Sequence, residues 1–391
     1  YSDYTNIYSD VITNISTNTT PNLSIAYPDH VATYMEGQDV IIPLDKLIED
    51  ERYGLGGSEL KFDSVTKDEI IPKFLSECVV NGSYCILPFM RSTEALYVNK
   101  SYLVENGFEV PEVFTWDYVW EICAYARKQA DLKKEVMIPL IYKSTDNMFI
   151  QLCKQKNLDF TTDKGKVLFL SDEVKDMLLE LSEPMDKGYM DTFKRVSYPG
   201  NFFNKGQCIF AIDSTAGSTW IGTDAPLLDI PESEVTNFET VVRMIPQEDP
   251  EHPSMISQGP SMCLFSKEDP QEVLASWLFM QYLLTSETQI AFAKTEGYLP
   301  VTKTAVESKE FQEYLQDVNE YDVKRAATSL ILDNINSTFT TAVFNGSSLC
   351  RSASGYLIEA MFNKEYRDKR SLDKLFASVN TRYKLSTYEI Q

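Results

Sequence analysis

A run of polar side chains interrupts an apolar stretch in the first quarter of the chain. Residues 87–98, LPFMRSTEALYV, are apolar at both ends and carry Arg91, Ser92 and Thr93 in the middle. A strand inside one hydrophobic core has no place for a guanidinium and two hydroxyls in succession, because buried polar groups destabilise a protein unless they are hydrogen-bonded. The segment therefore raises the question of what these three groups face.

Side chains typical of enzyme active sites are scarce. The chain has only two histidines, His30 and His252, so a Cys/His metal site or a Ser-His-Asp triad is hard to assemble. It contains no GxSxG, Walker or HExxH motif. Paired carboxylates of a glycosidase stay open, since 58 acidic residues offer many pairs, although most acids lie on solvated faces. The pattern favours a binding protein that is not an enzyme and uses no cofactor or metal.

Charge and cysteine content narrow the class further. A formal net charge of -22 sets aside nucleic acid and anionic membrane as partners, and an anionic ligand would need a local cluster of donors. The seven cysteines form no CxxC motif and mostly have apolar neighbours. We expect them to be buried small hydrophobes, and their odd number argues against a complete disulfide framework. No apolar run is long enough to predict a membrane span.

The elements that would position a site read as alternating strands and helices. A length of 391 residues favours two domains. Apolar runs at 22–27, 137–142 and 207–212 predict buried strands. Thr115 and Asp269 are expected to cap helices, each followed by an apolar stripe. Strands that alternate with helices predict α/β layers.

Two segments resemble family 1 extracytoplasmic solute-binding proteins of ABC importers. They are LPFMRSTEALYVNKSYLVENGFEVPEVFTWDYVWEI, from Leu87, and SKEDPQEVLASWLFMQYLLTSETQIAFAKTEGYLPVTKTAV, from Ser266. The ordered blocks extend the resemblance over nearly all of the chain. The resemblance implies an α/β, two-lobed periplasmic-binding-protein fold with an interlobe cleft and crossing hinge strands. Residues 91–93 would then cross the cleft and face ligand or water, while Leu87, Phe89, Leu96 and Val98 face the two cores.

The resemblance also implies a division of the chain into lobes. Residues 1–96 plus 263–308 are expected to form lobe 1, and 97–262 plus 309–391 lobe 2. Family members open with a strand and a helix before the segment matching YSDYTNIYSDV. We therefore expect the first strand–helix unit of lobe 1 to be missing.

Within this family the likeness is greatest to members that bind glycerol-3-phosphate and glycerophosphodiesters. Position by position, their ligand contacts fall on seven residues: Tyr4, Asp29, Ser92, Ser214, Gly259, Tyr298 and Arg351. Four more residues are candidates to line the cleft: Arg91, Asp146, Phe149 and Trp220. Asp146 and Phe149 stand where those members carry Trp, which keeps a neutral sugar or oligosaccharide open as an alternative ligand.

The implied function is capture of a small solute by hinge closure and its delivery to an ABC permease in the membrane. The protein would act outside the cytoplasmic membrane as a monomer, either as a cell-surface lipoprotein or in the periplasm. Arg351 would bind phosphate through its fork of N–H donors. A cleft glycosidase, in which Asp29 is the only acid that can be placed, and a surface adhesin with a filled cleft are the remaining alternatives.

Overall fold

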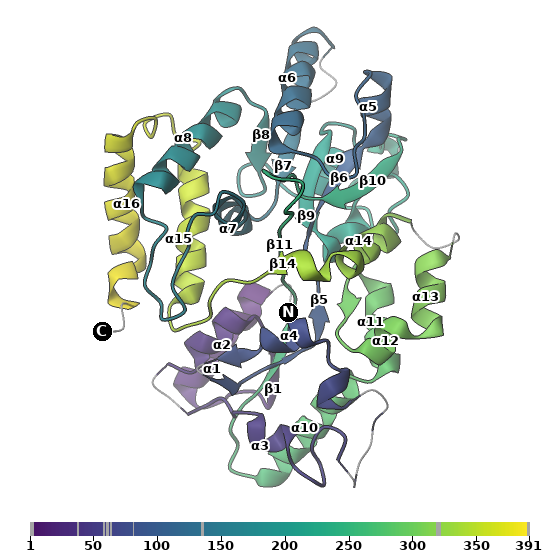
Figure 1. Cartoon of the computed structure of the whole chain (residues 1–391), viewed down its shortest axis with the longest axis vertical. Coiled ribbons are helices and arrows are strands. Elements are labelled where there is room, and N and C mark those ends of the chain that lie inside the picture. The colour runs from purple at the N-terminus through teal and green to yellow at the C-terminus, as the bar shows by residue number, and fades with distance from the viewer. Residues whose placement is uncertain are drawn as a thin grey trace.

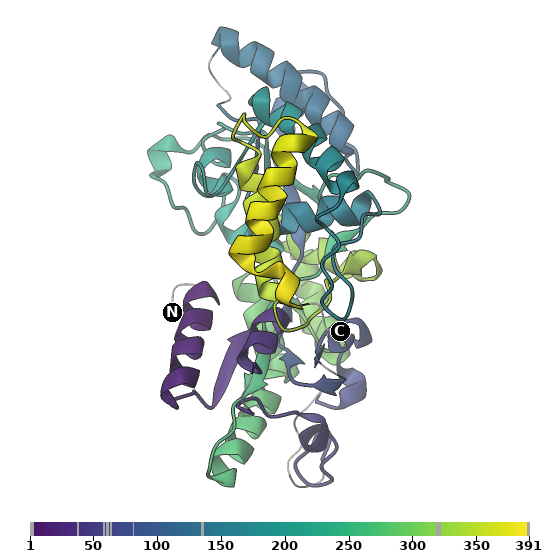
Figure 2. The same cartoon turned by 90° about the vertical axis from the view of Figure 1, so that its left-hand side faces the viewer.

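The computed structural model describes residues 4–36, 39–57, 59, 62, 65–80, 82–133, 137–317 and 322–388. Two lobes, each built on its own β-sheet, are stacked along the longest axis of the molecule (Figure 1 and, turned by 90°, Figure 2). The expected α/β, two-lobed fold is therefore confirmed. Among the helices of the described residues, none combines the length and apolar character needed to cross a bilayer.

The second lobe, uppermost in Figure 1, contains a mixed five-stranded sheet with the order β10-β6-β9-β7-β8. Strand β6 runs antiparallel to β10 and β9, whereas β7 runs parallel to β9 and β8. The strands are β6 (Glu94–Asn99), β7 (Leu140–Tyr142), β8 (Met190–Thr192), β9 (Phe210–Ser214) and β10 (Thr240–Met244).

Alternate side chains of a strand point to opposite faces of the sheet. Both faces of this sheet are buried, so its strands contribute to two different cores. Leu96 and Val98 join one core cluster, as the sequence predicts, and Ala95 and Tyr97 join another on the opposite face. Helices whose side chains enter the first cluster are α6 (Trp116–Lys133), α7 (Thr145–Gln155), α8 (Asp172–Asp186), α15 (Ser347–Ala360) and α16 (Lys369–Tyr383). The short α5 (Lys100–Glu105), which follows β6, also places Leu103 in the first cluster. Helices whose side chains enter the second cluster are α9 (Pro199–Phe203) and α14 (Asp322–Asp333).

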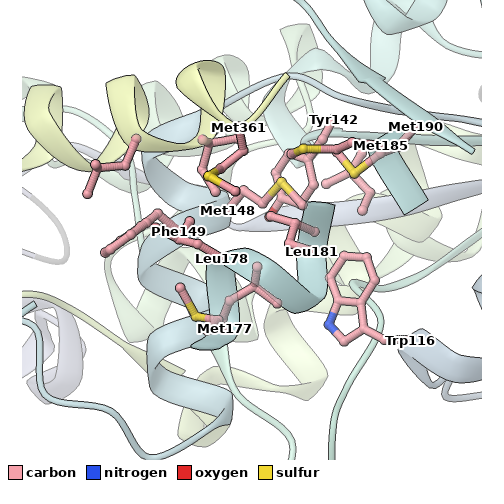
Figure 3. Packing of buried hydrophobic residues seen from close by; sticks show 14 of the residues in the cluster. Trp116, Tyr142, Met148, Phe149, Met177, Leu178, Leu181, Met185, Met190 and Met361 are labelled. Carbon is pink, nitrogen blue, oxygen red and sulfur yellow. The ribbon is translucent and has the colours of Figure 1, made fainter. Parts of the chain in front are cut away.

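The first of these clusters is rich in methionine and aromatic side chains (Figure 3). Met148 and Phe149 of α7 lie beside Met361 and face Met177 and Leu178 of α8. Methionine is flexible and fills irregular gaps between helices. Helix α7 is thereby fixed against α8 and α15, and its first turn is held at the junction of the lobes.

The first lobe contains an antiparallel three-stranded sheet with the order β1-β12-β4. Its strands are β1 (Leu23–Ala26), β12 (Ser261–Leu264) and β4 (Leu87–Pro88), with a small hairpin of β2 (Val79–Val80) and β3 (Ser83–Tyr84). The helices of the first half of the lobe are α1 (Tyr4–Thr17), α2 (Pro28–Tyr34), α3 (Asp45–Ile48) and α4 (Pro72–Ser76). Later in the chain come α10 (Pro270–Leu283), α11 (Ser286–Thr295), α12 (Lys303–Glu307) and α13 (Lys309–Gln316).

Phe311 and Tyr314 of α13 pack in the first-lobe core, although the predicted division placed residues after 308 in the second lobe. Leu96 belongs to the second-lobe core, although the same division ended lobe 1 at residue 96. All seven cysteines are buried and free, which confirms that they serve as small core side chains.

Extended segments meet where the two lobes join. Strand β5 (Met90–Arg91) pairs with β13 (Leu299–Pro300), and β11 (Met255–Ile256) pairs with β14 (Thr338–Phe339). The Ser92 N–H donates to the Gln258 carbonyl at 2.7 Å, and the Ser257 N–H donates to the Phe339 carbonyl at 2.7 Å. The chain segments around residues 92, 257 and 339 thus form the connection between the lobes.

The prediction that residues 91–93 face ligand or water holds only in part. All three are buried, with exposures of 1%, 2% and 0%. Arg91 pairs with Glu77, the backbone of Ser92 pairs with Gln258, and the Thr93 hydroxyl donates to the Ile256 carbonyl at 2.8 Å. Protein groups rather than solvent satisfy these residues, and Arg91 also lines a cavity between the lobes.

Candidate functional site

A cavity of about 510 Å³ lies between the lobes, a size typical of small-molecule sites. The first lobe contributes side chains from the start of α1, from the turn between β1 and α2, and from the residue after α4. The second lobe contributes the first turn of α7 and one face of α15, and connecting segments form the remainder. Its polar and aromatic lining includes Tyr4, Tyr8, Tyr27, Asp29, His30, Glu77, Arg91, Asp146, Asn147, Lys194, Gln258, Thr340, Thr341, Ser348 and Arg351.

Aromatic rings from the first lobe form one wall. The ring centres of Tyr4 and Tyr27 are 4.8 Å apart, those of Tyr8 and His30 4.5 Å, and those of Tyr27 and His30 5.3 Å. Burial raises the pKa values of Tyr4 and Tyr27 above the usual range, so their hydroxyls stay protonated. Burial also lowers the pKa of His30, which favours the neutral ring at pH 7. This wall therefore offers ring faces and hydroxyls with little charge.

Arg351 occupies the opposite wall, on α15. Its Nη2 donates to the Asp146 carboxylate at 2.8 Å and also to the Asn147 side-chain oxygen. Burial by itself lowers the pKa of Arg351, but Asp146 and Asp29 outweigh it and leave that pKa above its ordinary value. The guanidinium is charged, and part of its donor fork is occupied by protein acceptors.

A second ion pair lies at the junction of the lobes. The Arg91 Nε donates to the Glu77 Oε2 at 2.9 Å, with both side chains at most 5% exposed. The Ser257 hydroxyl donates to the same carboxylate oxygen at 3.1 Å. A buried pair of this kind requires further hydrogen bonds, and Arg91 supplies them by donating to the carbonyls of Met90 and Pro260. The Arg91 charge is therefore neutralised by the protein itself.

Two charged side chains in the lining differ from these pairs. Over the part of the chain that the structure describes, we find no ion pair for the Asp29 carboxylate or the Lys194 ammonium. Asp29 lies in the first turn of α2, directly after Tyr27 and Pro28. Both groups border the cavity and can interact with whatever occupies it. No group of three or more metal-ligating side chains occurs within the described residues.

The structure brings together six of the residues predicted from the sequence. Tyr4, Asp29, Gly259 and Arg351 line the cavity, as do two of the additional candidates, Arg91 and Asp146. Tyr298 does not line it but lies directly behind, with its hydroxyl 3.2 Å from that of Tyr4. These residues come from both walls of the cavity.

Besides Tyr298, four predicted residues do not line this cavity. Ser92 is 2% exposed and lies in the paired backbone between the lobes. The Ser214 hydroxyl instead caps η2 (Thr215–Trp220) by accepting from the Ala216 N–H at 3.2 Å. Phe149 is fully buried in the second-lobe core beside Phe169. Trp220 is 43% exposed at the end of η2.

Several lining residues were missed. Tyr27 and His30 flank Asp29 just beyond the end of β1, and the end of a predicted strand was a usable signal for them. Glu77 and Lys194 lie in segments whose sequence gives no comparable signal. Only the packing of the two lobes brings them to the cavity.

Comparison with known proteins identifies the class. A sequence model of the family described as bacterial extracellular solute-binding protein matches residues 1–317, so the chain belongs to that family. A search of curated proteins finds no significant match. The chain is the substrate-binding component of an ABC importer, and the proteins of this class bind solutes and deliver them to permeases without chemical conversion.

Solved structures similar to this chain share its fold. UgpB from Mycobacterium tuberculosis in complex with glycerophosphocholine has a TM-score of 0.76 at 16% identity, covering 100% of this chain and 90% of that chain. Maltose-bound MalE3 of T. maritima has a TM-score of 0.71 at 15% identity, and the match covers 97% of this chain and 90% of that chain. A solute-binding protein from Thermotoga lettingae bound with α-D-tagatose has a TM-score of 0.72 at 14% identity, and the match covers 97% of this chain and 90% of that chain.

Proposed function

We propose that the cavity captures a small polyhydroxylated solute, in the first place a mono- or disaccharide, when the lobes close around it. The observation that carries the proposal is the pairing of two unlike walls across one cavity. Tyr4, Tyr8 and Tyr27 offer ring faces for the apolar faces of a sugar. The opposite wall offers amide and hydroxyl groups, and Asp29 offers a carboxylate that accepts more than one hydroxyl.

Charge pairing supports a neutral solute. Arg351 is paired with Asp146, and Arg91 with Glu77. A phosphate would have to compete with these carboxylates for the two arginines. It would also be repelled by the Asp29 carboxylate, for which we find no ion pair among the described residues. The order of preference is therefore the reverse of the one expected from the sequence, because the sequence did not reveal that both arginines have acidic partners.

Glycerol-3-phosphate or a glycerophosphodiester is the second candidate. It is favoured by Lys194, a lining cation for which we find no ion pair among the described residues, and by the remaining donors of Arg351. A phosphate bound there would gain charge-assisted hydrogen bonds from both.

Calorimetric titration separates the two candidates. Glucose, maltose, glycerol-3-phosphate and glycerophosphocholine would each be titrated into the whole protein at low and moderate salt. We expect a sugar to bind, with an affinity that salt hardly changes and that Asp29→Asn weakens at least tenfold. Binding of phosphate compounds alone, weakened by salt and by Lys194→Gln, would overturn the sugar assignment.

We also propose that the protein acts as a monomer and is retained at the cell surface as a lipoprotein or in the periplasm. The family description, bacterial extracellular solute-binding protein, supports an extracytoplasmic location. Light scattering on the purified protein tests the oligomeric state, and a mass near 44.6 kDa is expected.

A further inference from the structure

A buried carboxyl group lies just behind the cavity, at the point where the chain enters the second lobe. Glu94 is the first residue of β6 and is 1% exposed. It follows directly on residues 91–93, which connect the lobes. Glu94 does not line the cavity, so any effect it has on a solute must pass through another residue.

Asn147 is that residue. The Glu94 carboxyl accepts from the Tyr142 hydroxyl at 2.6 Å through Oε2 and from the Asn147 Nδ2 at 3.1 Å through Oε1. The second hydrogen of the same Nδ2 reaches Gln258 Oε1 at 3.0 Å. With both amide hydrogens used, the Asn147 oxygen is turned toward Arg351 and accepts from its Nη2.

These bonds join three parts of the molecule. Asn147 is in the first turn of α7, Arg351 is on α15, and Gln258 belongs to a segment that connects the lobes. Asn147, Gln258 and Arg351 all line the cavity. Because Glu94 holds the Asn147 amide in one orientation, it also holds the side chains of Arg351 and Gln258 in place at the cavity.

We propose that Glu94 is a positioning residue for solute binding, which orients the Asn147 amide and, through it, Arg351 and Gln258. This inference rests on the proposed role of the cavity as the solute site. Removing the acceptor would leave an Asn147 N–H buried without its partner, and an unsatisfied donor is strongly destabilising where water is excluded. The amide could then rotate, and the guanidinium would lose one of its two acceptors.

The charged groups around Glu94 define how the arrangement depends on pH. Burial raises the pKa of Glu94 to about 8, more than the bonds from Tyr142 and Asn147 lower it, and Asp146 and Asp213 raise it further. Burial holds the pKa of Tyr142 well above its ordinary value, so Tyr142 remains a donor. Lys143 is paired with Asp213 at 2.7 Å and stays charged. Glu94 is thus the group facing Asn147 that changes charge between pH 7 and 9.

The test compares Glu94→Gln and Glu94→Leu with a matched control. Glu359→Gln removes another partly buried carboxyl, which lies on the same helix as Arg351 but hydrogen-bonds Thr192 at 2.9 Å. With the solute that the wild type binds, we expect Glu94→Gln to stay within about threefold at pH 6.5. The carboxamide oxygen can still accept from the Asn147 Nδ2, and its NH₂ can donate to the Tyr142 oxygen. Glu94→Leu should weaken binding roughly tenfold to a hundredfold. Glu359→Gln should change neither the affinity nor its pH profile.

The pH profile separates positioning from a merely structural role. Between pH 6.5 and 9 we expect the wild-type affinity to depart from that of Glu94→Gln by at least threefold, while the profile of Glu94→Gln stays flat. Superimposable profiles, or a Glu94→Leu variant that binds as well as the wild type, would overturn the proposal.

A readout without solute keeps this proposal separate from the proposed function. The side-chain NH₂ resonances of Asn147 in selectively labelled protein should shift as pH rises through about 8 in the wild type and not in Glu94→Gln. If no solute of the panel binds but these resonances titrate as described, the ligand assignment fails and the positioning role survives. If they do not titrate, the positioning role fails whatever the solute is.

Discussion

At the residue scale, Glu94 makes the stability of the protein depend on pH. Burial raises its folded-state pKa from 4.5 to about 8, so between these values the folded protein holds a proton that the unfolded chain has lost. The contribution of Glu94 to the free energy of unfolding is fully present below about pH 4.5 and is lost as pH rises through about 8.

We therefore expect Glu94→Gln to equal the wild type near pH 5 and to be more stable at pH 9, by a few kcal/mol at most. Urea unfolding at pH 5, 7 and 9 measures the difference, with the exposed Glu268→Gln as the control. A gap between variant and wild type that is the same at all three pH values would contradict the assignment.

Gly259 shows why one lining position must be glycine. Its φ is +128°, and an added Cβ would lie 2.4 Å from the Met90 carbonyl oxygen, in the connection between the lobes. We expect Gly259→Ala to lower the free energy of unfolding by about 1–3 kcal/mol and to weaken solute binding.

Gly107→Ala is the matched control for Gly259. It also has a positive φ, +79°, but an added Cβ there meets nothing within 4 Å. Denaturant titration should show the smaller loss for Gly107→Ala, about 1 kcal/mol or less. Equal losses at the two glycines would mean that close packing against Met90 is unimportant.

The resemblance to a known family supplied seven candidate ligand-binding residues, and four of them line the cavity. Tyr4, Asp29, Gly259 and Arg351 fall on elements whose ends meet at the cavity. Asp146 and Phe149 were treated alike and are neighbours on α7, three residues apart. Only Asp146, in the first turn, borders the cavity, whereas Phe149 lies in the second-lobe core. Spacing along a helix does not say which turn reaches a cavity until the neighbouring helices are known.

At the element scale, helix starts follow from local chemistry. Asp269 caps α10, as predicted: its Oδ1 accepts a hydrogen bond from the Gln271 N–H at 2.8 Å. Pro270 follows as the first residue of the helix. We expect Asp269→Ala to cost about 1 kcal/mol in unfolding free energy. Thermal or urea unfolding measures it, and Glu268→Ala, which removes a neighbouring exposed acid, should have little effect. Equal losses in the two variants would point to general charge rather than to the cap.

Strands were predicted less sharply than helix starts. The run at 137–142 contains β7, but only Leu140–Tyr142 pair in the sheet. The preceding residues are placed by long-range contacts, such as the hydrogen bond from the Ile138 N–H to the Gln207 carbonyl. The stripe expected on α10 was partly wrong: Trp277 is buried, but Leu274 and Leu278 are only half-buried. Which side of a helix is covered depends on tertiary contacts.

At the scale of the whole molecule, the account predicts that solute changes the shape of the protein. Groups from both lobes border one cavity, so a bound solute that bridges them favours the closed form. Small-angle scattering should show a smaller radius of gyration with saturating solute than without it. Asp29→Asn should need at least tenfold more solute for the same change. An unchanged radius at saturation would exclude closure as the mode of capture.

Lobe boundaries depend on contacts that are remote in sequence. Helix α13 packs its Phe311 and Tyr314 with first-lobe residues such as Ile290. The next helix, α14, places Ala327 in a second-lobe cluster and Ile331 in the first-lobe core. Helix α14 therefore packs in the cores of both lobes, although its sequence shows no change in composition that would mark a boundary. A boundary of this kind can be located only once the cores are assembled.

The central claim is that a solute sits between the tyrosines of the first lobe and the polar wall of α15. A crystal structure of the protein grown with the sugar that binds most tightly tests it most directly. The account predicts density for one molecule that contacts Asp29 and Arg351 and packs on Tyr4 or Tyr27. Density for that molecule elsewhere on the surface, with the cavity filled only by water, would contradict it.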